Sequence, residues 1–123
     1  MKHLFILSAI LFLSACEITP VTDETCITID VVYEAEGINE SYASCTESII
    51  AQDFVQAIED ELEVELVSSS FGDYVAGLVG YNFETLGMNA YWAIYLNDEY
   101  APVGISELEV ADGDILLFIT ETY

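Results

Sequence analysis

The sequence is nearly devoid of positively charged side chains. Its 123 residues contain one lysine, one histidine and no arginine, against 23 aspartates and glutamates. The two cations, Lys2 and His3, stand at the N-terminus. Without cationic side chains the rest of the surface cannot hold phosphate groups, which argues against binding of nucleic acid or of anionic lipid headgroups.

The same absence limits catalysis. Histidine, lysine and arginine supply most general bases near neutral pH, Schiff-base nucleophiles and cationic stabilisers of oxyanions. A pair of carboxylates could still hydrolyse a glycosidic bond, but no spacing among the 23 acids singles out such a pair. We therefore expect a protein that is not an enzyme.

A long hydrophobic run is missing as well, apart from a short one at the N-terminus. Apolar residues dominate Leu4–Leu13, which is too short to span a bilayer as a helix and is typical of a signal peptide. The run ends in Leu13-Ser14-Ala15-Cys16, which resembles the lipobox of bacterial lipoproteins, where the cysteine is acylated and becomes the mature N-terminus. We predict lipidation at Cys16. The alternative is an ordinary secretory signal cut near Ala15.

Either form of cleavage places the mature protein outside the cytoplasm. We expect residues 1–16 to be the signal peptide, residues 17–25 a short tether and residues 26–123 one domain. Glu17, directly after the cysteine, resembles lipoproteins that are not retained at the inner membrane. The predicted location is the outer membrane of a double-membraned bacterium, or otherwise the outer face of the cell membrane, with palmitate-type acyl chains as the anchor.

Cysteine is scarce too, and beyond Cys16 it is limited to Cys26 and Cys45. Two cysteines in an exported domain of this size favour a disulfide. If residues 26–33 pair antiparallel with residues 39–45 around a turn at Gly37, the two cysteines face each other at the open end of the hairpin. Such a bridge closes a loop of about 20 residues and contributes ~3 kcal/mol on the chain-entropy model. Two free thiols are the alternative, but no basic residue is available to lower their pKa.

A stripe of apolar residues at every fourth position runs from Ile50 to Leu62. This spacing predicts a single helix over residues 49–62, capped by Ser48, with one face in the core. Acidic residues from Glu59 to Glu65 follow at its C-terminal end, where they oppose the helix dipole. Solvated counter-ions could compensate for these charges. A bound calcium ion is the alternative, although no EF-hand pattern is present.

Several strands complete the pattern. Alternation begins again at Val64, and three glycines within Phe71–Gly80 indicate bulges or close backbone approach. An aromatic strand, Tyr91–Asn97, and a final strand, Ile115–Thr122, follow; the last is entered through a turn at Asp112-Gly113-Asp114. The order of elements predicts an α+β domain in which one helix packs on a mixed sheet.

The order hairpin, helix and glycine-rich segment carries a family resemblance, together with the later motifs Tyr91-Trp92-x-x-Tyr95-x-Asn97, Gly104 and Asp112-Gly113-Asp114. It resembles bacterial surface lipoproteins of undetermined function that are similar to the C-terminal β-domain of the cobalamin carriers transcobalamin and intrinsic factor. The resemblance implies a β-grasp-like fold. That family usually has Asn-Gly where this chain has Asn97-Asp98, so the turn is expected to differ.

The aromatic strand and the polar loop after it are the candidate recognition surface. Amphipathic aromatics beside a polar loop suit flat or ring-shaped ligands. The candidate ligand-binding residues are Tyr91, Trp92, Tyr95, Asn97, Pro102 and Gly104, with the loop of residues 100–104. The alternative is that Trp92, Ile94 and Leu96 face the core while the two tyrosines cover the other side of the sheet.

Three functions are compatible with these features. The first is a membrane-anchored, non-enzymatic binding or interaction module, for which a surface protein is a possible partner. The second, implied by the resemblance, is a corrinoid-binding accessory protein that works alone or beside a transporter. It would cradle cobalamin without a histidine ligand, because the mature chain has no histidine. The third is a structural surface lipoprotein without a small-molecule ligand.

Overall fold

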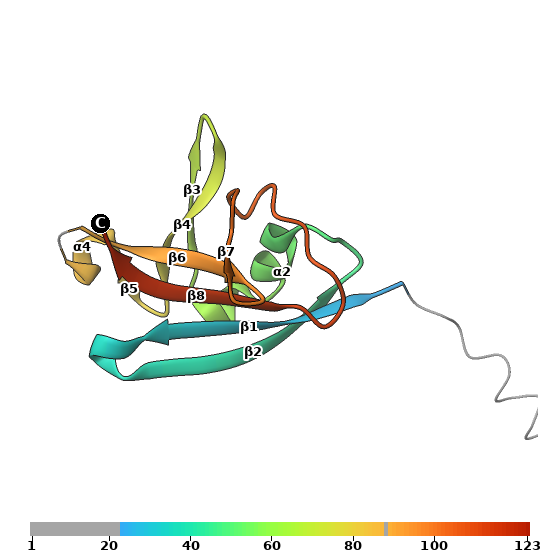
Figure 1. Cartoon of the computed structure of the whole chain (residues 1–123), viewed down its shortest axis with the longest axis horizontal. Helices are drawn as coiled ribbons and strands as arrows, with labels where there is room; N and C mark the ends of the chain where they lie inside the picture. Colours follow the sequence, from blue (N-terminus) through green and yellow to red (C-terminus); the bar gives the residue numbers. More distant parts are fainter. Residues whose placement is uncertain (1–22, 88) are drawn as a thin grey trace, which may run out of the picture.

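The computed structural model describes residues 23–87 and 89–123, which form two β-sheets and short helices (Figure 1). The predicted signal peptide, Cys16 and most of the predicted tether lie outside the described residues. In chain order the elements are β1 (Thr25–Tyr33), the 3-10 helix η1 (Glu34–Glu36), β2 (Ile38–Thr46), α2 (Ala51–Ala57), α3 (Glu59–Leu62), β3 (Glu65–Ser69), β4 (Gly72–Leu78), β5 (Tyr81–Asn82), α4 (Phe83–Leu86), β6 (Ala90–Leu96), β7 (Glu99–Tyr100) and β8 (Ile115–Thr122). The α+β prediction is confirmed. Within the described residues, no helix has the length and apolarity needed to cross a membrane.

The larger sheet has five strands in the order β2-β1-β8-β6-β7. Strand β8 lies at its centre, parallel to β1 and antiparallel to β6, so the sheet is mixed as predicted. Leu116 and Phe118 of β8 are fully buried and lie opposite Ile29 and Val31 of β1. The first and last strands of the domain therefore meet in the middle of its core.

The β1–β2 hairpin has the predicted register. All nine residues of β1 pair with β2, and Cys26 lies opposite Cys45 at the open end. The two cysteines form a disulfide, and Gly37 adopts the left-handed conformation (φ 69°) in the turn. The turn before β8 is fastened to the same place, because the Cys26 N–H donates to Asp112 Oδ1 (2.8 Å) and the Gly113 N–H donates to the Cys26 carbonyl (2.8 Å).

The helical region differs from the prediction of one helix over residues 49–62. Ile50 is extended and forms a β-bridge with Glu109, so α2 begins at Ala51. Ser48 does not cap the helix; its hydroxyl accepts from the Ile50 N–H at 3.0 Å and donates to Asp53. Carbonyls of a distant loop receive the first helical N–H groups instead, since Ala51 and Gln52 donate to residues 108 and 105.

The helix is also interrupted. Ile58 has φ −124° and ψ 34°, which separates α2 from the short α3. The apolar stripe itself is confirmed, because Phe54, Val55 and Leu62 are fully buried. They share the core with Ile29, Val31, Leu78, Ile105, Leu116 and Phe118.

The smaller sheet contains β3, β4 and β5, and its β3–β4 hairpin projects from the rest of the molecule (Figure 1). The glycine-rich segment behaves as predicted. The register shifts between Glu65 and Leu66, and a Cβ on Gly77 would lie 3.3 Å from the Asn82 Cα on β5. Glycine at position 77 therefore permits close approach of the two strands.

Candidate functional site

The candidate site is built on the β6–β7 hairpin. Asn97 and Asp98 connect the strands with positive φ angles of 50° and 71°, so the chain makes a tight two-residue turn even without the Asn-Gly pair. The Asn97 side chain fixes this turn to the start of β8. Its Nδ2 donates to Asp114 Oδ1 (3.0 Å), and its Oδ1 accepts from the Ile115 N–H (2.9 Å). The side chain of Asn97 is thus used within the fold.

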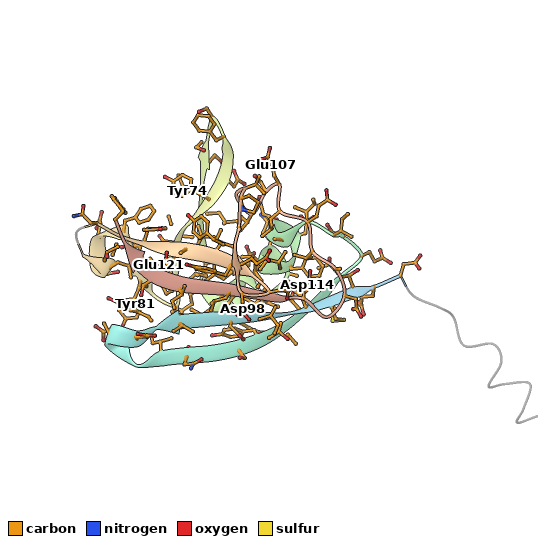
Figure 2. All side chains as sticks on the ribbon, viewed as in Figure 1. Tyr74, Tyr81, Asp98, Glu107, Asp114 and Glu121 are labelled. Atoms are coloured by element: carbon orange, nitrogen blue, oxygen red, sulfur yellow. A yellow bond between two sulfur atoms is a disulfide. The ribbon has the colours of Figure 1, made fainter. Side chains whose placement is uncertain are left out.

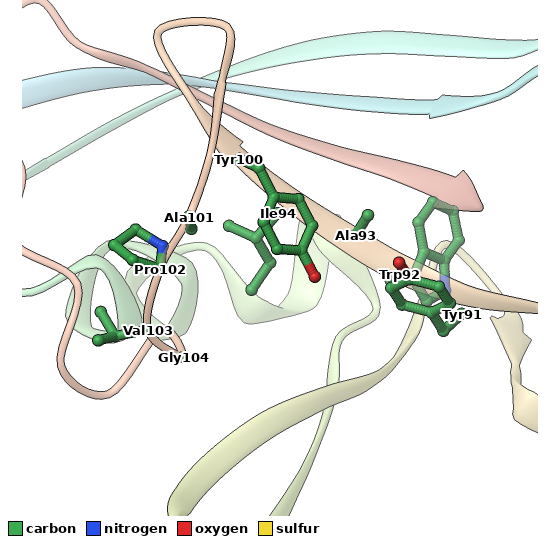
Figure 3. A pocket seen from close by; sticks show the side chains of 9 residues that line it. All are labelled: Tyr91, Trp92, Ala93, Ile94, Tyr100, Ala101, Pro102, Val103 and Gly104. Atoms are coloured by element: carbon green, nitrogen blue, oxygen red, sulfur yellow. The ribbon is translucent and has the colours of Figure 1, made fainter. Parts of the chain in front are cut away.

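Strand β7 is short, and this creates the space for a cavity. It pairs with Tyr95 and Leu96 alone, and one further bond joins the Ala101 N–H to the Ile94 carbonyl (2.9 Å). Beyond that point the chain turns away from β6. A cavity of about 320 Å³ opens between residues 91–94 of β6 and residues 100–104 (Figure 3).

Four of the six candidate residues line this cavity, namely Tyr91, Trp92, Pro102 and Gly104. Tyr100, from the predicted loop, lines it as well. Tyr95 and Asn97 do not. Sequence reasoning did not include Ala93 and Ile94 as site residues, because the short pairing of β7 that leaves this part of β6 next to a cavity is not visible in the sequence.

Trp92 lies in the core and also lines the cavity. It is 4 % exposed, and its indole N–H donates to the Tyr81 carbonyl at 3.0 Å. Its ring lies edge-on to Tyr33, with the centroids 6.1 Å apart. Ile94 and Leu96 also pack against the core, so the predicted alternative orientation of these three residues is confirmed. Trp92 belongs to the core and contributes to the cavity wall from there.

Glu121 of β8 (Figure 2) forms a hydrogen-bonded group with the tyrosines of β6, on the face of the sheet opposite Trp92. The Tyr95 hydroxyl donates to Glu121 Oε2 at 2.5 Å, and the Tyr91 hydroxyl donates to Oε1 at 3.3 Å. Tyr100 stands edge-on to Tyr95, with ring centroids 5.5 Å apart. Because β6 and β8 are neighbours, one carboxylate thus orients two phenols.

These contacts hold the phenols in their neutral form. The hydrogen bond to Glu121, followed by desolvation and the carboxylate charge, raises the pKa of Tyr95. The pKa of Tyr91 is raised to about 12, chiefly by the hydrogen bond with the Tyr100 hydroxyl and then by desolvation. Near neutral pH both side chains therefore act as hydrogen-bond donors and as aromatic surfaces rather than as bases.

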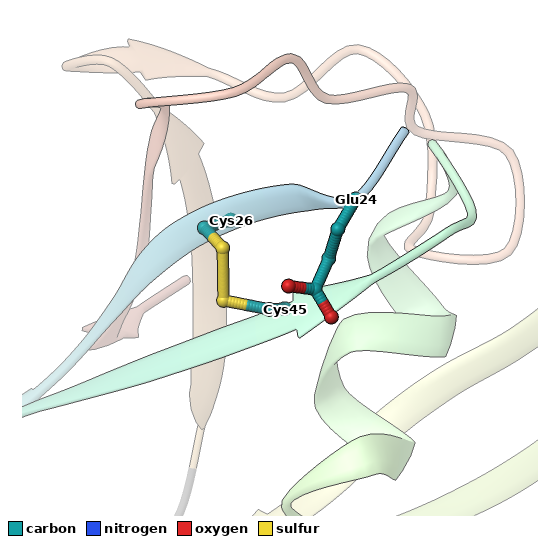
Figure 4. A group of neighbouring side chains, drawn as sticks. All are labelled: Glu24, Cys26 and Cys45. Carbon is teal, nitrogen blue, oxygen red and sulfur yellow. A yellow bond between two sulfur atoms is a disulfide. The ribbon is translucent and has the colours of Figure 1, made fainter. Parts of the chain in front are cut away.

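The open end of the β1–β2 hairpin brings a carboxylate close to two sulfur atoms. Glu24 lies with Cys26 and Cys45 so that their ligand atoms fall within 4.8 Å of one another (Figure 4). The two sulfur atoms form the disulfide, so they are not thiolate ligands. The carboxylates of residues 59–65 form no such three-residue group in the part of the chain that the structure describes.

Comparison with known families identifies the domain. Residues 51–122 match the sequence model of the family described as "Domain of unknown function (DUF4430)". The chain belongs to this family. The match extends from α2 to β8, so all the residues that line the cavity lie within the matched region. A search of curated protein sequences finds no match.

Two solved structures have a similar fold. One is a protein from Ruminococcus gnavus ATCC 29149, described as a "putative metal binding protein"; it is 15% identical with a TM-score of 0.69, over 80% of this chain and 98% of that one. The other is haptocorrin in complex with Cbi, 15% identical with a TM-score of 0.68, over 85% of this chain and 27% of that one. The likeness to haptocorrin agrees with the resemblance to cobalamin carriers, and at this identity it concerns the fold alone.

Proposed function

We propose that this DUF4430 protein is a lipid-anchored, extracytoplasmic module that binds a ligand without chemically converting it. The observation that carries the proposal is the cavity of about 320 Å³ at the edge of β6, where Tyr91, Trp92, Tyr100 and Pro102 come together. Its size falls at the lower end of the range for small-molecule sites, and aromatic walls are common in such sites. The fold likeness to haptocorrin in complex with Cbi supports a binding role.

A non-enzymatic role is consistent with the chemistry of the site. Residues 23–123 contain no histidine, lysine or arginine, and the phenols beside the cavity have raised pKa values. The cavity wall also carries no carboxylate, because Glu121 lies behind the tyrosines and is not part of the lining. General acid–base catalysis would therefore lack a group that titrates near neutral pH.

The anchor is tested separately from the ligand. Expression with radiolabelled palmitate should label the wild-type protein and leave Cys16→Ala unlabelled, and the variant should leave the membrane fraction. A labelled Cys16→Ala protein would contradict the assignment. Cys26→Ala is the matched control, because that cysteine lies in the disulfide and should not affect labelling.

A corrinoid is the alternative ligand, supported by the likeness to haptocorrin in complex with Cbi. The cavity is much smaller than a corrin ring system, so it could hold one edge or one side group of the ring. In this form the protein would be an accessory for corrinoid uptake, working beside a transporter. A structural role without a small-molecule ligand is what remains if the cavity binds nothing.

Titration of the full chain in a non-ionic detergent with Cbi and cobalamin, followed by Trp92 fluorescence, tests the corrinoid alternative. The chain has one tryptophan, so the signal reports on the cavity wall. Free N-acetyltryptophanamide corrects for light absorption by the corrinoid. Saturable quenching that Tyr100→Ala weakens and Tyr74→Ala leaves unchanged would support binding at the cavity. A response equal to that of the free amino-acid derivative would exclude corrinoids.

A further inference from the structure

The cavity has an uncharged but partly polar lining, because Tyr91 and Tyr100 contribute hydroxyl groups. Its side chains are aromatic or aliphatic, and none of them is charged. The rings of Tyr91 and Tyr100 come from neighbouring strands, and Figure 3 shows their hydroxyl ends directed toward each other beside the opening. Tyr100 is 59% exposed, so its ring is accessible to a ligand.

The electrostatic surroundings are uniform. No cationic side chain follows His3, whereas 23 carboxylates do. An anion in the cavity would lose its water without gaining a positively charged partner, while the field of the whole molecule repels it. A cation is attracted by the same field. The ligand of this site is therefore either neutral or positively charged.

The tyrosines favour the positive ligand. The face of an aromatic ring is negative and attracts ammonium groups. Glu121 strengthens this effect, since its carboxylate accepts a hydrogen bond from the Tyr91 hydroxyl and places a negative charge beside that end of the side chain. The Tyr91 ring is thereby held in place and stays neutral, with the negative charge of the Glu121 carboxylate next to its hydroxyl.

The uncharged lining also selects among cations. A primary ammonium has three N–H groups that need acceptors, and the cavity lining offers no carboxylate to receive them. An alkylated ammonium has methyl groups in their place and needs apolar contact and ring faces. We infer that the cavity binds an alkylated ammonium group, and this inference rests on the proposed function of the cavity as the ligand site.

The experiment compares choline with 3,3-dimethylbutan-1-ol, in which carbon replaces the charged nitrogen at nearly the same shape. The probe is the indole N–H signal of Trp92 in ¹⁵N spectra of the full chain, in a maltoside detergent, with potassium chloride balancing the ionic strength. We expect a saturable shift with choline and about tenfold weaker binding of the neutral alcohol. Tyr100→Leu should weaken choline binding by about fivefold, and Tyr74→Leu, at a residue that does not line the cavity, should not.

A third probe separates two sources of the same group. Glycerophosphocholine carries the ammonium of a lipid headgroup next to a phosphate, which the acidic chain should repel. Binding of choline alone indicates a free ammonium compound, whereas equal binding of both indicates a headgroup. Either result agrees with the inference.

The contrary results are distinct. Equal or stronger binding of the neutral alcohol, reduced by Tyr100→Leu, would overturn the ammonium inference and retain the cavity as a ligand site. Choline binding that is unchanged in Tyr100→Leu would place the cation elsewhere and also overturn it. If neither probe nor a corrinoid shifts the Trp92 signal, both the inference and the proposed function of the cavity fail.

Discussion

The two edge strands of the five-stranded sheet, β2 and β7, differ in how much of the neighbouring strand they pair with. At one edge β2 covers β1 along all nine residues, and a disulfide closes the open end. At the other edge β7 pairs with two residues of β6, and the tight turn is held by the side chain of Asn97. The fully covered edge pairs every residue of β1. The partly covered edge leaves residues 91–94 next to a cavity.

The difference teaches which edge of the sheet is held most firmly and which edge leaves a cavity. A covalent bond and a full ladder of hydrogen bonds fix the β2 edge. A few side-chain hydrogen bonds fix the β7 edge, so that the loop of residues 100–104 can be placed independently of the strand. Perturbing each edge should therefore affect different properties, stability at the first and the cavity at the second.

The largest effect is expected at the disulfide edge. Replacement of Cys26 and Cys45 by serine removes the constraint on the unfolded chain over a sequence separation of 19 and should lower the free energy of unfolding. The loss should be about 3 kcal/mol in urea denaturation. Wild-type protein in a reducing agent is the control and should match the double variant. Equal stability of the oxidised and reduced wild type would show that the bridge does not stabilise this edge.

A smaller effect is expected at the turn of the other edge. Asn97→Ala removes two hydrogen bonds, one to Asp114 just before β8 and one to Ile115 at its start, and places alanine at φ 50°. The free energy of unfolding should fall by about 1–2 kcal/mol, and ligand binding at the cavity should weaken as the loop loses its position. Asn97→Gly is the informative comparison, because it loses the hydrogen bonds and keeps the backbone conformation. If both variants were as stable as the wild type, the turn would not depend on this side chain.

A substitution at the next residue, Asp98, should instead raise the free energy of unfolding. Asp98 has φ 71°, which glycine adopts more readily, so Asp98→Gly should raise the free energy of unfolding by about 0.5 kcal/mol. The variant introduces the Asn-Gly pair that the family resemblance leads us to expect at this turn. Asp112→Gly, in the turn before β8, is the control; it loses the hydrogen bond from the Cys26 N–H and should be destabilised. A destabilised Asp98→Gly would mean that the aspartate side chain contributes to the turn.

The contrast between the edges also explains what the sequence could predict. The β1–β2 hairpin, its register and the disulfide follow from residues close together in the chain, and all were predicted. The stripe of Phe54, Val55 and Leu62 is local as well, and its burial was predicted. Local patterns were sufficient wherever a strand or helix is completed by its immediate neighbours.

The start of the helix was not predictable in the same way. Ser48 is a good capping residue, but carbonyls of residues 105 and 108 receive the N–H groups of Gln52 and Ala51 and move the helix start to Ala51. These acceptors lie more than fifty residues away in the chain. A distant loop thus replaced the local cap.

The candidate site was predicted in part for a related reason. The aromatic and loop residues indicated Tyr91, Trp92, Pro102 and Gly104, which do line the cavity. Tyr95 is instead bonded to Glu121, a contact set by the register of β6 on β8. That register joins segments some thirty residues apart, and alternation along one strand does not reveal it.

The smallest effect, at the edge with the cavity, depends on pH. Tyr91 and Tyr95 have raised pKa values in the folded protein, so the unfolded chain loses these protons first as pH rises. Their contribution to stability should be complete below a pH of about 10 and should decline up to about 12. Ultraviolet titration of tyrosinate measures the pKa values of the tyrosines, and urea denaturation across this pH range measures the free energy of unfolding. Tyr100→Phe should lower the pKa of Tyr91 most, since the hydrogen bond with the Tyr100 hydroxyl is the largest cause of that raised pKa. Glu121→Gln should lower mainly the pKa of Tyr95. If Glu121→Gln instead lowered the pKa of Tyr91 more than Tyr100→Phe does, Glu121 alone would hold both phenols.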